Sequence, residues 1–366
     1  MIDKPGPISP DEAIKYFNIT QRPPRTIDRL KRPELYPNDK RGWKYGDGGW
    51  GSQRIPWAED DMDCDYDAYW ADEITGEEIF GYLARSSPVL IRGLLDDWPM
   101  VNVSTADQLK KLHGGIQTLL SNIPYADKFG GEGIWTNISA YIDMIREQKV
   151  PGGRSPWYMF RGHRVPHESE SEDSIVPADV CTTPPKVATA MKMLHYRADE
   201  KPGTPLARIT DVNLQWSLGI EGSGAPTHFH NVAWYAQLRC FCCRLYCRRV
   251  GLMFGAKKWI LQPPHNMIMS NQPPLIFYED AIPKLKERGV RFTTCMQTAG
   301  DVVIVPECWG HGVVNVQPSI SVAIEEINYI WRVRQNPNIV NRLPMNKRAY
   351  LVVHNAEAAE KDSRLN

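Results

Sequence analysis

Three histidines, and the strands expected to carry them, most limit what this chain can fold into. His228 and His230 are two residues apart in Ala-Pro-Thr-His-Phe-His, and residues i and i+2 of a strand point to the same face of a sheet. His311 follows the apolar run 302–305 and a Pro-Glu-Cys-Trp-Gly turn, so it can reach the same place from a neighbouring strand. Imidazole suits iron, zinc, copper and nickel. The pattern favours a β fold with a histidine metal site; histidines that bind no metal are the alternative.

Two further blocks make this pattern much more specific. The first is Gly-Ala-Lys-Lys-Trp-Ile-Leu-Gln-Pro-Pro at 255–264. The second is Gly-Asp-Val-Val-Ile-Val-Pro-Glu-Cys-Trp-Gly-His at 300–311, followed by Val313 and Asn315. In order and spacing, both blocks resemble the JmjC, or cupin-like, domain of the Fe(II)/2-oxoglutarate oxygenase superfamily, in its His-x-His subgroup. The resemblance covers roughly residues 60–335, with the sharp motifs confined to 222–325.

The resemblance implies a mainly β fold with surrounding helices, namely a double-stranded β-helix or jelly roll of antiparallel strands. The resemblance covers a JmjC or cupin-like domain at 61–335; residues 1–60, rich in Pro, Gly and charged side chains, are expected as an extended N-terminal arm, and the polar residues 336–366 as a C-terminal extension. The core barrel is expected at about 200–328. Apolar patterning predicts strands at 88–93, 157–160, 212–220, 302–305 and 319–325, and helices that begin near 75, 104, 139 and 184.

The resemblance also implies a metal site. In the family, two histidines and one carboxylate hold Fe(II), and the facial arrangement leaves positions for 2-oxoglutarate and O₂. His228 and His311 match the two histidine ligands. His230 stands at the position of the carboxylate, which is the main departure from the family pattern. We therefore expect His230 as a third metal ligand; such a site can hold Fe(II), but also zinc or nickel without oxygenase activity.

Three more residues are candidates for binding the cosubstrate. Lys257 matches the family lysine that pairs with the distal carboxylate of 2-oxoglutarate, whereas a surface lysine is the alternative interpretation. Tyr235 stands where many relatives have Asn, and Asn315 closes the second histidine motif. Glu325 falls near a position where relatives often have a Thr that contacts the cosubstrate.

These residues support hypotheses from different classes. The first is an Fe(II)- and 2-oxoglutarate-dependent oxygenase that hydroxylates a protein or peptide, with demethylation as the outcome on an N-methyl group. Histone demethylases usually carry reader domains, and none is visible in this sequence. The second is a catalytically inactive JmjC-like binding protein, which His230 favours. A three-histidine cupin with another small substrate is a third, but it does not need Gly-x-Lys-x-Trp.

Composition restricts the partners. The 366 residues carry 43 basic and 43 acidic side chains, and a net charge of zero argues against bulk affinity for nucleic acid. No run of about 18 apolar residues exists, so no membrane span is expected. The start Met-Ile-Asp-Lys-Pro has no apolar stretch typical of a signal peptide. A cytoplasmic or nuclear location is expected, or a lumenal one if the N-terminus is incomplete.

Residues 239–253 interrupt the motif region. They hold four of the eight cysteines and four arginines, and this clustering is not a disulfide framework spread through a fold. Without them the sequence reads Ala-Trp-Tyr-Ala-Gln-Leu-Phe-Gly-Ala-Lys-Lys. This is a continuous strand-turn-strand, and it restores the family's spacing between the first histidine and the lysine. Three interpretations stay open: a zinc knuckle, a hairpin extension with free thiols, or a segment absent from the natural chain, such as a translated intron. A genuine insertion should bulge at the rim of the barrel.

Overall fold

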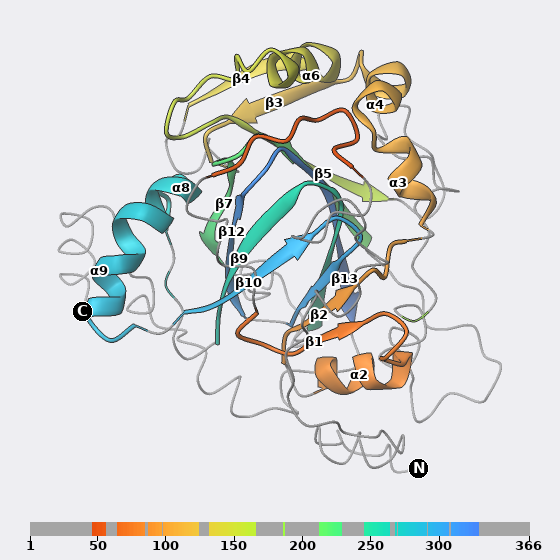
Figure 1. Ribbon diagram of the computed structural model, residues 1–366, viewed down its shortest axis with the longest axis vertical. Coiled ribbons are helices and arrows are strands. Elements are labelled where there is room, and N and C mark those ends of the chain that lie inside the picture. Colours follow the sequence, from red (N-terminus) through yellow and green to blue (C-terminus); the bar gives the residue numbers. More distant parts are fainter. Residues whose placement is uncertain are drawn as a thin grey trace, which may run out of the picture.

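Two β sheets face each other at the centre of the protein (Figure 1). The computed structural model describes residues 46–55, 64–84, 87–96, 98–123, 132–165, 186, 212–228, 245–263, 268, 270–290, 292–306 and 309–328. Within these ranges the larger sheet has nine strands. In sheet order they are β1 (Ala68–Trp70), β2 (Val89–Arg92), β11 (Val302–Val305), β8 (Leu245–Phe254), β13 (Ser319–Asn328), β6 (Val212–Gly219), β5 (Tyr158–Val165), β3 (Gln117–Ser121) and β4 (Gly133–Asn137).

The smaller sheet carries the histidine motifs. Its order in the described part of the chain is β10 (Thr293–Thr298), β9 (Ala256–Gln262), β12 (Gly310–Asn315) and β7 (Gly224–His228), all antiparallel. In the larger sheet only β1 and β2 pair in parallel. The fold is mainly β and of the jelly-roll type, as the sequence predicts. The strands predicted at 88–93, 157–160, 212–220, 302–305 and 319–325 are confirmed as β2, β5, β6, β11 and β13.

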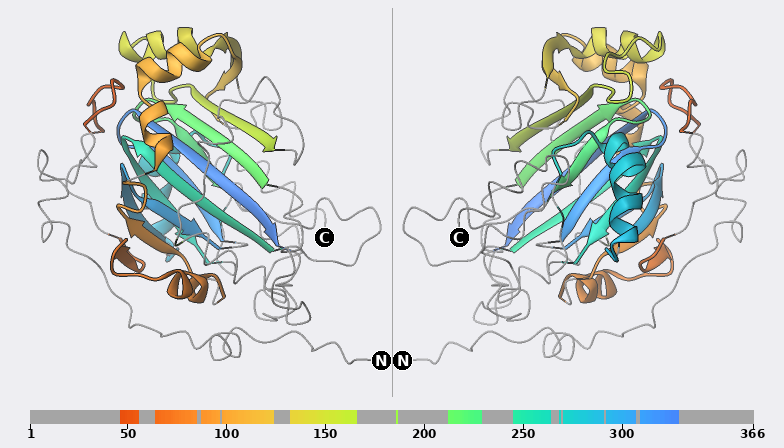
Figure 2. Two further views of the ribbon diagram at one scale, coloured as in Figure 1. Left: turned by 90° about the vertical axis from the view of Figure 1, so that its right-hand side faces the viewer. Right: turned by 90° about the vertical axis from the view of Figure 1, so that its left-hand side faces the viewer.

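Short helices surround the sheets (Figure 2). They are α2 (Gly76–Ala84), α3 (Pro99–Val103), α4 (Ala106–His113), α6 (Ile138–Arg146), α8 (Pro274–Ile276), the π-helical turn η6 (Phe277–Ala281) and α9 (Ile282–Glu287). α4 and α6 pack together at one end of the barrel, and α2 lies at the other. α8 contacts β7 and β12 of the smaller sheet. No helix in these ranges is long and apolar enough to cross a membrane.

Local capping explains where three of the predicted helices begin. The Thr75 hydroxyl accepts from the Glu78 N–H at 3.2 Å, and the Glu78 carboxylate accepts from the Thr75 N–H at 2.9 Å, which is a capping box before α2. Thr105 caps α4 and Asn137 caps α6 through their side-chain oxygens. The helix predicted at 184 and beyond falls almost entirely outside the described residues.

The strand β11 shows how the core is built. Val302 and Ile304 pack in a cluster against the helices, whereas Val303 and Val305 pack in a second cluster between the two sheets. A continuous apolar run is what a strand with two buried faces requires. The turn before β9 needs Gly255, whose φ is 88°, because a Cβ there would lie 2.2 Å from the Pro318 carbonyl oxygen.

A buried ion pair joins β2 to the start of β11. An Arg92 Nη1–H donates to Asp301 Oδ2 at 2.6 Å, and both side chains are at most 2% exposed. Asp301 also accepts from the backbone N–H of Gly93 and from the N–H and hydroxyl of Thr298. The ion pair and these hydrogen bonds together offset the free energy that the carboxylate loses when it leaves water.

The structure contains a disulfide that the cysteine pattern of the sequence did not predict. Cys64 and Cys295 form a disulfide between the segment before β1 and strand β10, across 231 residues of sequence. Asp65 continues the connection, because its carboxylate accepts from the N–H of Thr294 at 2.7 Å. The two members of this pair lie far apart in the chain, and neither belongs to the cysteine cluster at 240–247 that dominates the sequence pattern.

Residues 46–55 differ from the extended arm expected at 1–60. The Trp50 indole N–H donates to the Ser104 carbonyl at 3.0 Å, and the Ile55 N–H donates to the Val316 carbonyl at 3.0 Å. Trp50 is 1% exposed. This Gly-rich stretch lacks apolar periodicity, but its glycines adopt positive φ and let one aromatic residue enter the core. The two sheets also extend beyond the core barrel expected at about 200–328, because the strands β1 to β5 precede residue 200.

The expected bulge at 239–253 is wrong for residues 245–253. They form nine of the ten residues of β8, which lies between β11 and β13 inside the larger sheet. Val250 packs in the cluster between the sheets and Met253 in the cluster against the helices, so both faces of this central strand are buried. The remaining residues, 239–244, lie outside the described ranges, so the zinc-knuckle and free-thiol interpretations stay predictions there.

Lys258 is a buried cation on the opposite face of β9 from Lys257. It is 3% exposed, and its backbone carbonyl accepts from the Tyr278 hydroxyl at 3.3 Å. Burial lowers the pKa of the Lys258 ammonium to about 8, and the charge of Lys286 adds to the shift. The folded state therefore binds fewer protons than the unfolded chain between pH 8 and the ordinary value of 10.5.

We expect Asp301→Asn to lower the free energy of unfolding by about 3 to 5 kcal/mol, because Arg92 then keeps a buried charge without its counter-ion. Urea unfolding checks this. The double variant Arg92→Met/Asp301→Leu should recover part of the loss. A single variant as stable as the wild type would contradict a role of the pair in holding the sheet corner.

We expect Lys258→Met to stabilise the protein at pH 7, by roughly 1 to 3 kcal/mol, because the buried ammonium is removed. The gain should shrink as the pH rises from 8 towards 10, since the wild-type lysine then loses its charge in the folded state. Thermal unfolding at pH 7 and pH 10 measures both values. A gain that is independent of pH would show that packing, and not charge, sets the effect.

We expect a chain without residues 239–253 to fold. In that chain the mostly apolar residues 233–238 join Phe254 directly, and Tyr235 stands five positions before Gly255, as Val250 does now. The upstream segment can then occupy the place of β8 between β11 and β13. Circular dichroism and thermal unfolding of both forms test this. An unfolded shortened chain would show that residues 245–253 are irreplaceable.

Candidate functional site

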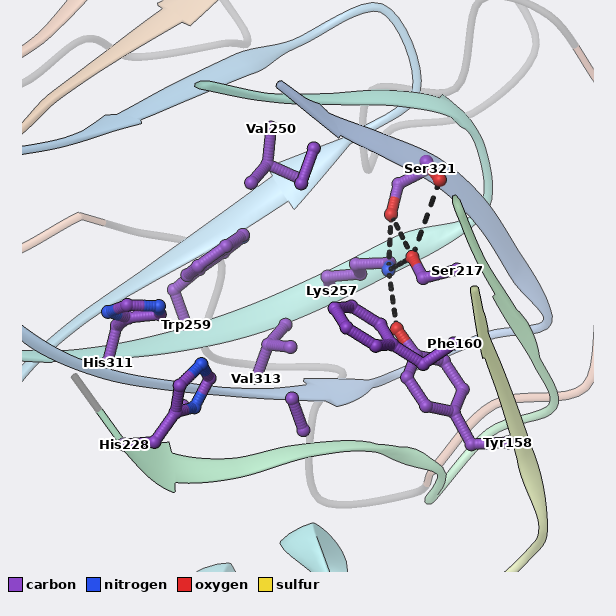
Figure 3. Close-up of a pocket in the computed structure, with 13 residues that line it drawn as sticks. Tyr158, Phe160, Ser217, His228, Val250, Lys257, Trp259, His311, Val313 and Ser321 are labelled. Atoms are coloured by element: carbon purple, nitrogen blue, oxygen red, sulfur yellow. Dashed lines mark hydrogen bonds between the residues drawn. The ribbon is translucent and has the colours of Figure 1, made fainter. Parts of the chain in front are cut away.

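Pairing between β7 and β12 brings the two matched histidines together (Figure 3). His228 is the last residue of β7 and lies directly opposite His311 of β12. Their ring centroids are 4.4 Å apart. The strands approach closely because Gly224 begins β7, where a Cβ would lie 2.1 Å from the Val313 carbonyl oxygen. The structure thus brings the two imidazoles together, and their role as metal ligands stays a prediction.

Backbone carbonyls fix the protonation of both rings. His228 Nδ1 lies 2.7 Å from the Pro226 carbonyl oxygen, and His311 Nδ1 lies 2.9 Å from the Trp309 carbonyl oxygen. A carbonyl oxygen only accepts, so each Nδ1 must carry the hydrogen when the ring is neutral. Each Nε2 then keeps its lone pair. Metal-binding histidines are held in this way in general, with one nitrogen on the metal and the other N–H on a carbonyl.

At the other end of the same pocket lies a buried ammonium group. Lys257 is 1% exposed and donates to the Ser321 hydroxyl at 2.6 Å and to the Ser217 hydroxyl at 2.9 Å. Its Nζ lies 3.5 Å from the Tyr158 hydroxyl and 5.8 Å from the centre of that ring. Figure 3 shows these groups converging from three sides. This cluster, Lys257 with Ser217, Ser321 and Tyr158, is called the lysine cluster below.

Apolar side chains line the space between the histidines and the lysine cluster. They come from both sheets and are Phe160, Ala225, Val250, Trp259, Val313 and Ala323. Few polar groups therefore compete for a ligand along this wall, and each polar contact is stronger than it would be in water. Such a pocket can hold a small molecule with an acidic group at the lysine end.

The serines of the lysine cluster were not foreseen. Ser217 of β6 and Ser321 of β13 are cross-strand partners, and their hydroxyls are hydrogen-bonded to each other. The sequence argument singled out Glu325 on the same strand, four residues further on, whose side chain lies outside the described ranges. A Ser at an inward position of an apolar strand was the only available signal. Tyr158 and Phe160 were read only as strand residues.

Asn315 lies beside the site and does not line the pocket. It is the cross-strand partner of Lys257, but its amide N–H groups donate to the Ser223 hydroxyl at 2.9 Å and the Gly219 carbonyl at 3.3 Å. Its contacts here are therefore with the turn between β6 and β7. Binding of the cosubstrate by Asn315 stays a prediction. Tyr235 falls outside the described residues.

The donors present fit part of an iron site. Imidazole nitrogens such as the Nε2 atoms of these two rings are suitable ligands for Fe(II). Within the described ranges no group of three or more His, Cys, Asp or Glu side chains could hold a metal ion. The third expected ligand, His230, comes two residues after His228 and lies outside those ranges.

Comparisons with known proteins agree with the fold. No protein-family model matches the chain. The chain is 24% identical to Arginine-specific demethylase JMJ22 of Arabidopsis thaliana, over 65% of this chain and 41% of that protein. It is 28% identical to JmjC domain-containing protein 8 of Homo sapiens, over 30% of this chain and 36% of that protein. The protein of the same name from Rattus norvegicus is 21% identical over 76% of this chain and 89% of its own length.

The chain spans less than half of the length of the first two relatives, so their whole-protein activities do not transfer with the match. Two of these three relatives are named for a JmjC domain. The chain is therefore similar to JmjC-domain proteins, and its jelly-roll fold agrees with that likeness.

Proposed function

We propose that this protein is an Fe(II)- and 2-oxoglutarate-dependent oxygenase that hydroxylates a protein or peptide. The proposal rests on one observation, which is that two different kinds of ligand-binding group lie at the two ends of one pocket. His228 and His311 offer Nε2 lone pairs at one end, and Lys257 offers a buried ammonium at the other. This is the arrangement that an iron ion and a dicarboxylate cosubstrate require.

The histidines would hold the iron. His228 and His311 would each provide Nε2, and His230 is the proposed third ligand in place of the family carboxylate. When bound, Fe(II) would supply the activation of O₂ that hydroxylation needs. The backbone carbonyls of Pro226 and Trp309 keep the rings in the tautomer that can bind a cation.

The lysine cluster would bind the distal carboxylate of 2-oxoglutarate. A carboxylate near Lys257 would form charge-assisted hydrogen bonds, with the Ser217 and Ser321 hydroxyls as further donors. The apolar wall between the two ends would exclude water from the reacting region. Binding at the lysine cluster would therefore orient the keto acid towards the histidines.

A protein substrate is supported by the names of the relatives. One is an arginine-specific demethylase and another, from Arabidopsis thaliana, is Lysine-specific demethylase JMJ21, 23% identical over 66% of this chain and 23% of that protein. Demethylation begins with hydroxylation of an N-methyl group, so both outcomes need the same pocket. The net charge of zero gives no reason to expect direct binding to nucleic acid.

One feature favours a second candidate, a JmjC-like protein that binds without catalysis. His230 replaces the carboxylate ligand, and a neutral imidazole compensates less of the charge of Fe(II) than a carboxylate does. The two candidates differ in a measurable quantity, the turnover of 2-oxoglutarate.

We expect the purified protein, loaded with Fe(II) without oxygen and then exposed to air, to convert 2-oxoglutarate to succinate. His228→Ala should lower the rate about 100-fold or more, because it removes a metal ligand. Succinate formation only in His230→Asp would favour the inactive-binder candidate. No iron binding in any form would refute the metal site.

We expect Lys257→Met to raise the KM for 2-oxoglutarate roughly 10- to 100-fold, which is the loss of one charge-assisted hydrogen bond of about 1.5 to 3 kcal/mol. Iron binding should be unchanged. Lys258→Met is the matched control, since it removes the neighbouring lysine from the opposite face of β9. Equal effects of both variants on KM would contradict the proposed role of Lys257.

A further inference from the structure

Trp259 forms the wall of the pocket beside His311. Its ring centroid is 6.4 Å from that of His311 with a tilt of 36°, and the side chain is 2% exposed. Trp259 lies on β9, two residues from Lys257 and therefore on the same face of the strand. Figure 3 shows its ring next to the imidazole, between the histidines and Val250. The Trp259 indole thus borders both the histidine end and the lysine end of the candidate site.

One buried amide holds the indole in place. The Trp259 Nε1–H donates to Gln297 Oε1 at 2.8 Å. The Gln297 Nε2 group donates to the Val250 carbonyl at 2.7 Å and to the Asp301 carbonyl at 2.9 Å. Both of these partners are acceptors, so the amide nitrogen must face them and the amide oxygen must face the indole. The orientation of Gln297 is therefore determined by its surroundings.

These bonds tie the pocket wall to the opposite sheet. Gln297 belongs to β10 and is 0% exposed, whereas Val250 belongs to β8 of the larger sheet and Asp301 precedes β11. A glutamine at this position satisfies three polar groups at once. Leaving any of them unpaired in the interior costs about 1 to 3 kcal/mol.

From this network we propose that Gln297 is a positioning residue for the metal centre: it holds Trp259 against His311 and so limits the rotation of that imidazole. The inference rests on the proposed function, because it assigns a partner to a proposed metal ligand. Restricting a ligand before the metal arrives lowers the entropy cost of binding, and groups behind a ligand typically change metal affinity about 10- to 100-fold.

The chain offers a matched control for this role. Trp50 is likewise buried, at 1% exposed, and its indole N–H also donates to a protein oxygen, the Ser104 carbonyl. It packs in the cluster against the helices and does not line the pocket. Trp50→Phe and Trp259→Phe therefore remove the same kind of hydrogen bond at two places. Only the second place borders a metal ligand.

The experiment titrates the full-length protein with Co(II), used alone as a probe for the iron position, and follows its absorption and the quenching of tryptophan fluorescence. Wild type should bind Co(II) with a loss of fluorescence. Gln297→Met and Trp259→Phe should weaken binding about tenfold, and Trp259→Phe should remove most of the quenching. Trp50→Phe should keep affinity and quenching within about twofold of wild type, even where its thermal stability falls as much as that of Trp259→Phe.

The outcomes separate two failures. Wild-type affinity in both Gln297→Met and Trp259→Phe would overturn the positioning role and leave the metal centre intact. Equal weakening by Trp50→Phe would also overturn it, because the effect would then follow general stability. No binding of Co(II) by wild type would refute the metal centre itself, and the positioning role with it.

Discussion

The buried carboxylate of Asp301 is the constraint on which the two-sheet arrangement depends. Residue 301 lies at the corner where the chain leaves β10 of the smaller sheet and enters β11 of the larger one. Its side chain binds Thr298 before the corner and Arg92 on β2, while its backbone carbonyl binds Gln297. A charge with no exposed surface is stable only with such a complete set of partners. The pocket lies between the sheets that this corner joins.

The alternation of residues along β9 decides which of its side chains reach the pocket and its apolar wall. Lys257 and Lys258 are adjacent, yet Lys257 donates to a cluster of hydroxyls, whereas the Lys258 side chain lies on the opposite face of β9. Their surroundings differ because alternate residues of β9 face opposite sides. The same alternation places Lys257 and Trp259 on the pocket side together. A single strand thus supplies the proposed anion-binding group and the wall beside the histidines.

Sequence alone predicted what is encoded locally. The apolar run at β11 and the helix start near residue 75 depend on neighbours in the chain, and both agree with the structure. The histidine pair was predictable because its motifs resemble those of a known family. Ser217 and Ser321 were not, because their contact depends on the register between strands about 100 residues apart. Nothing in either strand marks that register. The burial of Trp50 was missed for a related reason, since it is one aromatic residue in a Gly-rich stretch.

β8 shows a different limit. Residues 245–253 looked foreign to the motif because of their Cys and Arg content, but Val250 to Phe254 have the apolar character of an interior strand. Two stretches of this chain, 233–238 and 245–253, have patterns that suit the same central position. The two stretches differ in their content of Cys and Arg, whereas their patterns of apolar residues do not distinguish them.

The pairing of β2 with β11 has a consequence for how the protein reaches this fold. Val89 lies beside Ile304, so the apolar strand β2 must wait for more than 200 later residues before its partner exists. On a ribosome that adds roughly 5 to 20 residues per second, the wait lasts on the order of 10 to 40 seconds. During that time β2 and β1 offer an unsatisfied edge to other chains. Slow folding and a need for protection during synthesis follow from this topology, whatever reaction the finished pocket performs.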